Sequence, residues 1–345
     1  MKNRPLIDIK SLSSILSSKN RTSYVMTDAS IKINKGSCIG IVGESGSGKT
    51  QLFKAISGVQ EMIPGIVNGE VNFYINENKY EMYSKKRMKY RLSKYHKMLK
   101  KDLIGFIPQD PKSYLNPYWS IKKIFQETYR LHKQEITFNE FLRKYLNQVD
   151  IDFESYQNKL PSQLSGGEAQ RVMIALVLSK QPKLIIADES TTGLDVSRQR
   201  TVIDTFKKIH VSNPELTMIF ISHDFGFLSH VVDEYYVLYG GFVCEHIIDE
   251  NQFLDFKNLH PYTQDLISSL IPENNSNAPV HEEVSSSLLL EPLSGCPYYN
   301  MKCKDKNCNK ENHFHNKIPP MFDENGNSEN IDLNKKWKRS KVSNV

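Results

Sequence analysis

The sequence lacks an apolar run long enough to cross a membrane, because no stretch approaches the ~18 consecutive apolar residues that a span needs. The N-terminal residues MKNRPLIDIK also lack the apolar core of a signal peptide. We therefore expect a protein that stays in the cytoplasm. If it works at a membrane, other chains must supply the spans.

Cysteine is scarce, and no strong excess of charge of either sign is present. Of 345 residues only 5 are cysteine, and Cys38 and Cys244 lie singly in apolar runs, as small buried side chains do. The net charge of +6 does not by itself imply a nucleic-acid partner.

The segment Lys79–Lys101 is rich in Lys and Arg, with Tyr and Met interleaved. It is either a nucleic-acid patch or a solvated amphipathic helix, and we favour the helix because charge runs usually face solvent.

Short apolar runs alternate with helical patterns over the first three quarters of the chain. This alternation predicts an α/β fold, a parallel sheet wrapped by helices. The last run leads through Gly240-Gly241 into a predicted hairpin, and residues 110–181 have a mostly helical pattern. The predicted buried strands are Cys38–Val42, Leu184–Ala187, Thr217–Ile221 and Tyr235–Tyr239.

Residues 43–50 read GESGSGKT and match the phosphate-loop pattern G-x-x-x-x-G-K-[ST]. They follow a predicted strand and precede a helical run that Gly58 closes. Glycines let successive amides turn inward toward phosphate oxygens, and the helix N-terminus adds partial positive charge. Lys49 is predicted to reach the β- and γ-phosphates, and the Thr50 hydroxyl to bind Mg²⁺. The predicted ATP-binding residues of this loop are Gly43, Ser45, Gly46, Ser47, Gly48, Lys49 and Thr50.

A pair of acids ends the apolar run LIIADE at residues 184–189. Asp188 at the strand tip can hold the Mg²⁺ shell, and Glu189 can orient or deprotonate an attacking water. Such a pair could be only a turn. Downstream of a matching phosphate loop, the functional interpretation is favoured.

Residues 164–171 read LSGGEAQR, which resembles the signature of ATP-binding cassette (ABC) proteins, LSGGQ-x-QR. Ser165, Gly166 and Gly167 open a predicted helix whose N-terminus is another anion site. The resemblance implies that this element acts on the γ-phosphate of an ATP molecule held by the opposite subunit.

The remaining ABC elements occur in the family's order. Gln109 in FIPQDP resembles the glutamine that contacts Mg²⁺ and water, and His223 in FISHD resembles the switch histidine that senses the γ-phosphate. Asp195 in TTGLD resembles the D-loop aspartate at the dimer contact. The resemblance implies a RecA-like P-loop NTPase core with an ABC helical subdomain over about residues 110–181, and a head-to-tail dimer with Glu189 as catalytic carboxylate.

Two further segments, DPKSYLNP after Gln109 and HPYT at His260–Thr263, resemble the oligopeptide, dipeptide and nickel importer branch. The resemblance implies a second ABC ATPase subunit in a heterodimer, two membrane permeases and an external solute-binding protein, with this chain on the cytoplasmic face of the membrane. A nickel or metal-chelate importer is the alternative within the branch. A soluble nucleic-acid-associated ABC ATPase is disfavoured, because the chain has one cassette and no long coiled-coil insertion.

The chain departs from the family's pattern at a few positions. Ser190 follows the acidic pair where proline is usual, Gly193 replaces the commoner alanine, and Glu168 replaces glutamine in the signature. None of these changes removes a phosphate ligand, so we expect activity to survive. Tyr24 is the nearest upstream aromatic that could stack on adenine.

The composition changes after residue 272. Residues 1–272 are predicted to form the ATPase domain, 273–292 a linker rich in Asn, Ser, Glu and Pro, and 293–345 an extension with a disordered basic tail. The branch carries cysteines here that can hold an iron–sulfur cluster. Two interpretations stay open, a [4Fe-4S] or Zn²⁺ site and an unliganded segment. The candidate ligands are Cys296, Cys303 and Cys308, with His313 or His315 as a fourth.

Overall fold

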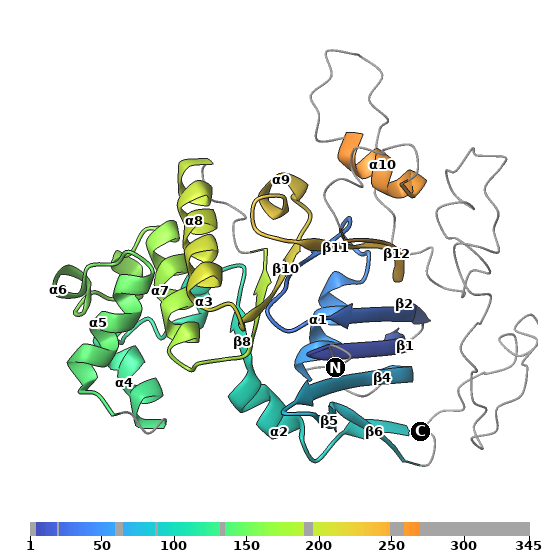
Figure 1. Cartoon of the computed structure of the whole chain (residues 1–345), viewed down its shortest axis with the longest axis horizontal. Helices are drawn as coiled ribbons and strands as arrows, with labels where there is room; N and C mark the ends of the chain where they lie inside the picture. The colour runs from blue at the N-terminus through green and yellow to red at the C-terminus, as the bar shows by residue number, and fades with distance from the viewer. Residues whose placement is uncertain are drawn as a thin grey trace, which may run out of the picture.

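The computed structural model describes residues 5–18, 21–58, 65–86, 89–131, 135–189, 196–248 and 259–268. These residues form a six-stranded sheet, a four-stranded sheet, a small hairpin and a group of helices (Figure 1). Helices α4 to α7 gather at one end of the molecule, and β1, β2 and β4 lie at the other (Figure 1). None of the helices in the described ranges is both long and apolar enough to cross a bilayer.

The six-stranded sheet has the order β12-β11-β3-β10-β9-β8, and only β12 is antiparallel to its neighbour. The four predicted strands are confirmed to within one residue, and the hairpin at Gly240-Gly241 is confirmed too. Strand β8 was not predicted, because its short run IGFI contains a glycine. The strands are β3 (Cys38–Val42), β8 (Ile104–Ile107), β9 (Leu184–Asp188), β10 (Thr217–Ser222), β11 (Glu234–Tyr239) and β12 (Phe242–Ile247).

Alternate residues of these strands enter two separate apolar cores. In β3, Ile39 and Ile41 contribute to one core, whereas Cys38 and Val42 contribute to the other. A parallel sheet covered on both faces needs apolar residues at consecutive positions, which is why its strands read as unbroken apolar runs. Cys38 is 1% exposed, as predicted, whereas Cys244 is only half-buried.

A second, antiparallel sheet has the order β2-β1-β4-β5, and the sequence did not predict it. Its residues join the core that also holds helix α1 (Lys49–Ser57). The β1–β2 pairing shifts register after Ile9 and again after Leu12, so the apolar alternation that would have indicated a strand is interrupted. The strands are β1 (Ile7–Ser18), β2 (Arg21–Ile33), β4 (Ile66–Ile75) and β5 (Asn78–Glu81).

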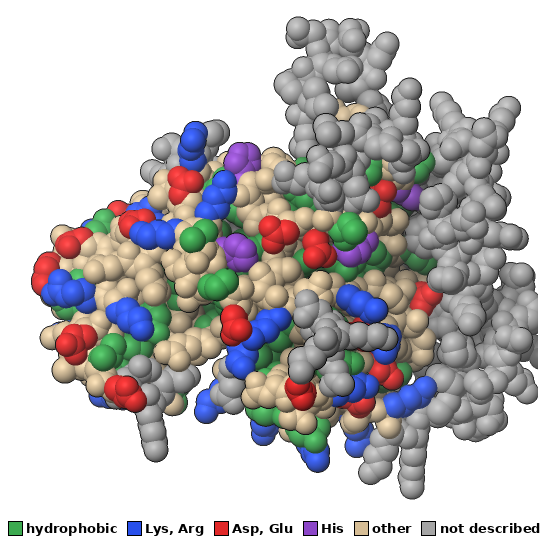
Figure 2. All heavy atoms as spheres, viewed as in Figure 1, with side chains coloured by type: hydrophobic (Ala, Val, Ile, Leu, Met, Phe, Trp, Pro, Cys, Tyr) green, Lys and Arg blue, Asp and Glu red, His purple; other side chains and the backbone are tan. Residues whose placement is uncertain are grey.

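The predicted amphipathic helix over Lys79–Lys101 is wrong for most of its length. Strand β5 is followed by the hairpin of β6 (Tyr83–Lys86) and β7 (Lys89–Leu92), and only then by α2 (His96–Met98) and the π-helix η1 (Leu99–Leu103). Met82 and Leu99 are buried, whereas the side chains of Lys85, Lys94 and Lys97 between them are exposed. Figure 2 shows Lys and Arg side chains along the edge where Figure 1 places β5, β6 and α2, so the charge run does face solvent.

Helices occupy most of the chain between β8 and β9. Thr137 caps α5 with a capping box to Glu140, and Phe125 and Phe141 are fully buried in the core between these helices. The elements are α3 (Pro111–Tyr114), α4 (Ile121–Leu131), α5 (Phe138–Gln148), α6 (Phe153–Tyr156), the 3₁₀ turn η2 (Pro161–Gln163) and α7 (Gly166–Leu178). Three later helices follow β9, β10 and β12, namely α8 (Val196–Ser212), α9 (Phe225–Leu228) and α10 (Pro261–Ser268).

Candidate nucleotide-binding and hydrolytic site

Four segments with predicted functional residues follow four neighbouring strands. The phosphate loop follows β3, Gln109 follows β8, Glu189 follows β9 and His223 follows β10. These strands are adjacent and parallel in the order β3-β10-β9-β8, so their carboxyl ends lie at one edge of the sheet. Ligands of open α/β sheets bind outside that edge.

The phosphate loop is shaped by three glycines with positive φ, 154° at Gly43, 81° at Gly46 and 104° at Gly48. A Cβ on Gly43 would lie 2.2 Å from the carbonyl oxygen of Leu238, so the loop packs closely against β11. Gly241 in the β11–β12 turn donates its N–H to the carbonyl oxygen of Ser47 at 3.1 Å. The sequence indicated a turn at Gly241 but gave no sign that this turn supports the loop.

Lys49 begins α1, and its side chain folds back over the loop. Its Nζ donates to the carbonyl oxygens of Gly43 and Glu44, at 2.6 and 2.8 Å. Burial lowers the pKa of Lys49, and the nearby charges of Glu189 and Asp188 oppose that shift. The Lys49 ammonium is therefore close enough to Glu189 and Asp188 to interact electrostatically with both carboxylates.

Glu189 connects the residues that the sequence predicted to act in hydrolysis. Gln109 donates from Nε2 to Glu189 Oε2 at 2.8 Å, and His223 Nδ1 lies 3.2 Å from Glu189 Oε1. The Glu189 N–H donates to the carbonyl oxygen of Ile221, which ties the residue to β10. Glu189 has φ of 42°, a conformation that costs a non-glycine residue free energy. The structure thus brings all three side chains together at one point.

Asp188 ends β9 beside Lys49, and Thr50 is exposed at the start of α1. Burial raises the pKa of Asp188, the charge of Glu189 raises it further, and Lys49 opposes both. A divalent cation would relieve the repulsion between two adjacent carboxylates. The oxygen donors of Thr50, Asp188 and Gln109 are ligands of the type that Mg²⁺ prefers, so the residues present fit this ion.

The signature residues Ser165, Gly166 and Gly167 lie at the start of α7. Ser165 caps the helix, its Oγ accepting the Glu168 N–H at 3.3 Å, while Glu168 accepts the Ser165 N–H at 2.7 Å. Tyr156 donates to the other Glu168 oxygen at 2.6 Å. The hydrogen bond from Tyr156, followed by that from the Ser165 backbone, lowers the pKa of Glu168 to about 2. Glu168 therefore carries a full negative charge beside Gly166 and Gly167.

Several predicted residues fall elsewhere. Tyr24 is 5% exposed within β2, so its ring is enclosed and cannot stack on adenine in this conformation, against the prediction. Asp195, Ser190 and Gly193 lie outside the described residues. The cysteine extension, including Cys296, Cys303 and Cys308, lies outside them as well.

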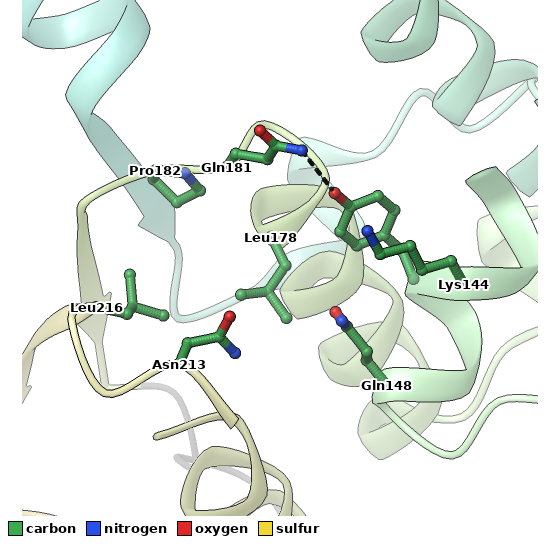
Figure 3. A pocket seen from close by; sticks show the side chains of 8 residues that line it. Lys144, Gln148, Leu178, Gln181, Pro182, Asn213 and Leu216 are labelled. Carbon is green, nitrogen blue, oxygen red and sulfur yellow. Dashed lines mark hydrogen bonds between the residues drawn. The ribbon is translucent and has the colours of Figure 1, made fainter. Parts of the chain in front are cut away.

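A hollow lies at the opposite edge of the sheet from the phosphate loop. Its lining residues Gln181 and Pro182 precede β9, and Asn213 and Leu216 precede β10, whereas the predicted functional residues follow these strands (Figure 3). Gln181 donates to the Tyr145 hydroxyl across its wall at 3.4 Å (Figure 3). The hollow is therefore separate from the nucleotide-binding edge.

A phosphate loop, an acidic strand end, a glutamine and a histidine at one sheet edge define the chain as a phosphate-loop ATPase. Residues 26–192 match the family described as ABC transporter. The chain is 32% identical over 330 residues to the oligopeptide transport ATP-binding protein OppF of Haemophilus influenzae, covering 92% of this chain and 90% of the relative. It is 31% identical to the dipeptide transport ATP-binding protein DppD of Caldanaerobacter subterraneus, covering 85% and 87%.

Solved structures show the same fold. The cbiO1 protein of Clostridium perfringens, part of the ABC transporter complex cbiONQ, aligns with a TM-score of 0.61 at 21% identity over 73% of this chain and 92% of that one. A dimeric ATP-binding cassette in a post-hydrolysis state with ADP and phosphate aligns with a TM-score of 0.56 at 22% identity, over 70% and 97%. The chain belongs to the family of ABC transporter ATP-binding proteins. It is an ATPase coupled to transport, and it binds ATP with Mg²⁺.

Proposed function

We propose that this chain is the ATP-hydrolysing subunit of an importer for oligopeptides or dipeptides. Relatives at about one third identity carry the names of oligopeptide and dipeptide transport proteins, and they are matched over most of their length. A nickel or metal-chelate importer is the second candidate, because the sequence of His260–Thr263 also resembles that part of the family. The names of the relatives favour peptides.

The contact of Glu189 with Gln109 and His223 is the observation that supports hydrolysis most directly. Glu189 would polarise the water that attacks the γ-phosphate, and Gln109 and His223 would hold its carboxylate and sense that phosphate. Lys49 would leave the carbonyl oxygens of the loop to contact the phosphates. Mg²⁺, held by Thr50, Gln109 and Asp188, would neutralise charge on the phosphates.

We propose a head-to-tail dimer, in which Ser165, Gly166 and Gly167 of one subunit complete the ATP site of the other, with Asp195 at the contact. The partner is a second, different ABC ATPase subunit. Two permease subunits supply the membrane path, and an external solute-binding protein delivers the peptide. This chain then lies at the cytoplasmic face of the membrane. The start of α7 at Gly166 and Gly167, capped by Ser165, is the feature that supports the signature's part in this assembly.

The test is ATP hydrolysis by this chain in membranes with its partner ATPase and permeases, compared with Glu189→Gln. We expect hydrolysis that depends on the permeases, rises with a peptide-loaded binding protein, and falls by about two or more orders of magnitude in the variant. An ATPase rate that does not depend on the permeases and that rises with RNA or DNA would refute the importer assignment. A response to nickel chelates but not to peptides would favour the second candidate.

The C-terminal cysteines extend this proposal to a metal site. Cys296, Cys303 and Cys308, with His313 or His315, would hold Zn²⁺ or a [4Fe-4S] cluster. Elemental analysis of the full chain purified without oxygen, together with its absorption spectrum, distinguishes iron from zinc. A chain that contains neither metal in stoichiometric amount would remove this part of the proposal.

A further inference from the structure

Helix α10 (Figure 1) begins at Pro261, within the segment HPYT, and the tyrosine of this segment is buried. Tyr262 is 1% exposed, and its ring packs on that of Tyr239 in β11 at 4.4 Å between centroids. The N–H of Tyr262 donates to His260 Nδ1 at 3.2 Å, and the N–H of His260 donates to Glu245 of β12 at 3.0 Å. The side chain of Tyr262 is therefore anchored from both its ring and its backbone.

The hydroxyl of Tyr262 reaches the phosphate loop. Its oxygen accepts the backbone N–H of Glu44, the second residue of the loop, at 2.9 Å. Burial raises the pKa of Tyr262, so the hydroxyl stays protonated and neutral at physiological pH. This bond joins α10 to the loop across 218 positions of sequence separation.

The N–H of Glu44 and the carbonyl of Gly43 belong to one planar peptide unit, and they point in opposite directions because the peptide is trans. Tyr262 holds the N–H side of this unit, and Lys49 Nζ donates to its carbonyl oxygen at 2.6 Å. Rotation of the unit would turn that oxygen away from Lys49. Gly43, with φ of 154°, lacks the Cβ that would restrict such rotation.

We propose that Tyr262 is a positioning residue of the ATP site, whose hydroxyl sets the orientation of the Gly43–Glu44 peptide and through it the shape of the phosphate loop and the place of Lys49 before ATP binds. It acts on ATP through the loop and does not touch the reacting atoms. Because the phosphate loop would contact the phosphates in both the bound state and the transition state, loss of the hydroxyl weakens ATP binding more than it slows the bound complex.

The variant Tyr262→Phe removes the hydroxyl alone and leaves the ring packed on Tyr239. We expect the Kd and the KM for ATP to rise about three- to tenfold, as loss of one buried hydrogen bond predicts, with kcat changed less than twofold. The Kd is measured with a fluorescent ATP analogue, which requires no turnover, and the KM in the transporter assembled in membranes. The Kd of the wild-type protein is measured in parallel. An unchanged Kd in the variant would contradict this inference, whereas a lack of transport activity in both proteins would contradict the proposed function.

Tyr236→Phe is the matched control. Tyr236 lies in β11, is 3% exposed, and bonds the backbone of Lys32 rather than the phosphate loop. We expect this variant to lose a similar amount of thermal stability and to keep the wild-type Kd for ATP. A wild-type Kd in Tyr262→Phe would overturn the proposal. An equal rise in Kd in both variants would also overturn it, since it would indicate general loosening of the fold.

Discussion

At the residue scale, the site depends on carboxylates whose surroundings differ. Glu189 shares its two oxygens between Gln109 and His223. Glu168 receives bonds from Tyr156 and from the start of its own helix. The first arrangement holds a carboxylate at the edge where phosphate binds, and the second places a permanent negative charge within the signature.

The low pKa of Glu168 predicts a pH-dependent contribution to stability. Its folded-state pKa of about 2 lies below its ordinary value of 4.5, so ionised Glu168 stabilises the fold above that ordinary value. This stabilisation is lost as pH falls from about 4.5 towards 2. Glu168→Gln has no such titration. The difference in thermal midpoint between wild type and variant should therefore shrink over this interval, and a constant difference would contradict the assignment.

The glycines of the phosphate loop should differ in their tolerance of alanine. Gly43 and Gly46 both have positive φ, but a Cβ on Gly43 would meet the Leu238 carbonyl, whereas one on Gly46 meets nothing within 4 Å. Gly46→Ala should cost about 1 kcal/mol for its backbone conformation, and Gly43→Ala at least about 2 kcal/mol. Urea unfolding measures both losses. Equal losses would mean that the loop does not pack on β11 as described.

At the scale of elements, the edge of the parallel sheet gathers the site, while capped helices carry the signature. Helix α7 begins at a capping box of Ser165 and Glu168, and α5 begins at a similar box of Thr137 and Glu140. These boxes satisfy N–H groups that a helix start leaves without intrahelical partners. The helical part of the molecule therefore owes some of its order to a few polar side chains at the surface.

Replacing the cap of α5 tests this contribution away from the ATP site. Thr137→Ala removes the Oγ that accepts the Glu140 N–H, so it should lower the free energy of unfolding by about 1 kcal/mol. Thr137→Ser keeps the hydroxyl and serves as the control. Chemical unfolding followed by circular dichroism gives both values, and an unchanged stability in the alanine variant would exclude a stabilising cap.

At the scale of the whole molecule, transport requires that ATP hydrolysis be coupled to the permeases. The segment after Gln109 exposes two aromatic side chains, Tyr114 at 65% and Tyr118 at 88%. Tyr118 makes an anchor of the kind that interfaces favour. We expect the permease contact at this surface, which belongs to the segment that follows Gln109 in the sequence.

Tyr118→Ala should uncouple the ATPase from its permeases without affecting the fold. We expect an unchanged Kd for ATP and a several-fold weaker stimulation of hydrolysis by the permeases, because truncating a central interface aromatic often costs about 2 kcal/mol. Val211→Ala is the control, since Val211 is 81% exposed near the end of α8. Normal stimulation in Tyr118→Ala would place the permease contact elsewhere.

The sequence alone predicted the elements whose structure depends mainly on residues close to one another in the chain. The four apolar runs became strands because a sheet covered on both faces requires unbroken apolar segments. Lys49 and Glu189 could be predicted because one stands in a phosphate-loop motif after an apolar run and the other ends such a run, whereas Gln109 and His223 were identified by their resemblance to ABC motifs. Parallel strands then placed them at one edge.

Only the tertiary structure decided what depends on contacts distant in sequence. Most of the segment Lys79–Lys101 formed strands rather than a helix, because the hairpin pairings of β5 with β4 and of β6 with β7 outweigh local helix preference. Tyr24, near the loop in sequence, proved to be enclosed in β2. The bond of Tyr262 to Glu44 has no local signal at all, because it exists only once β11, β12 and α10 have packed beside the phosphate loop.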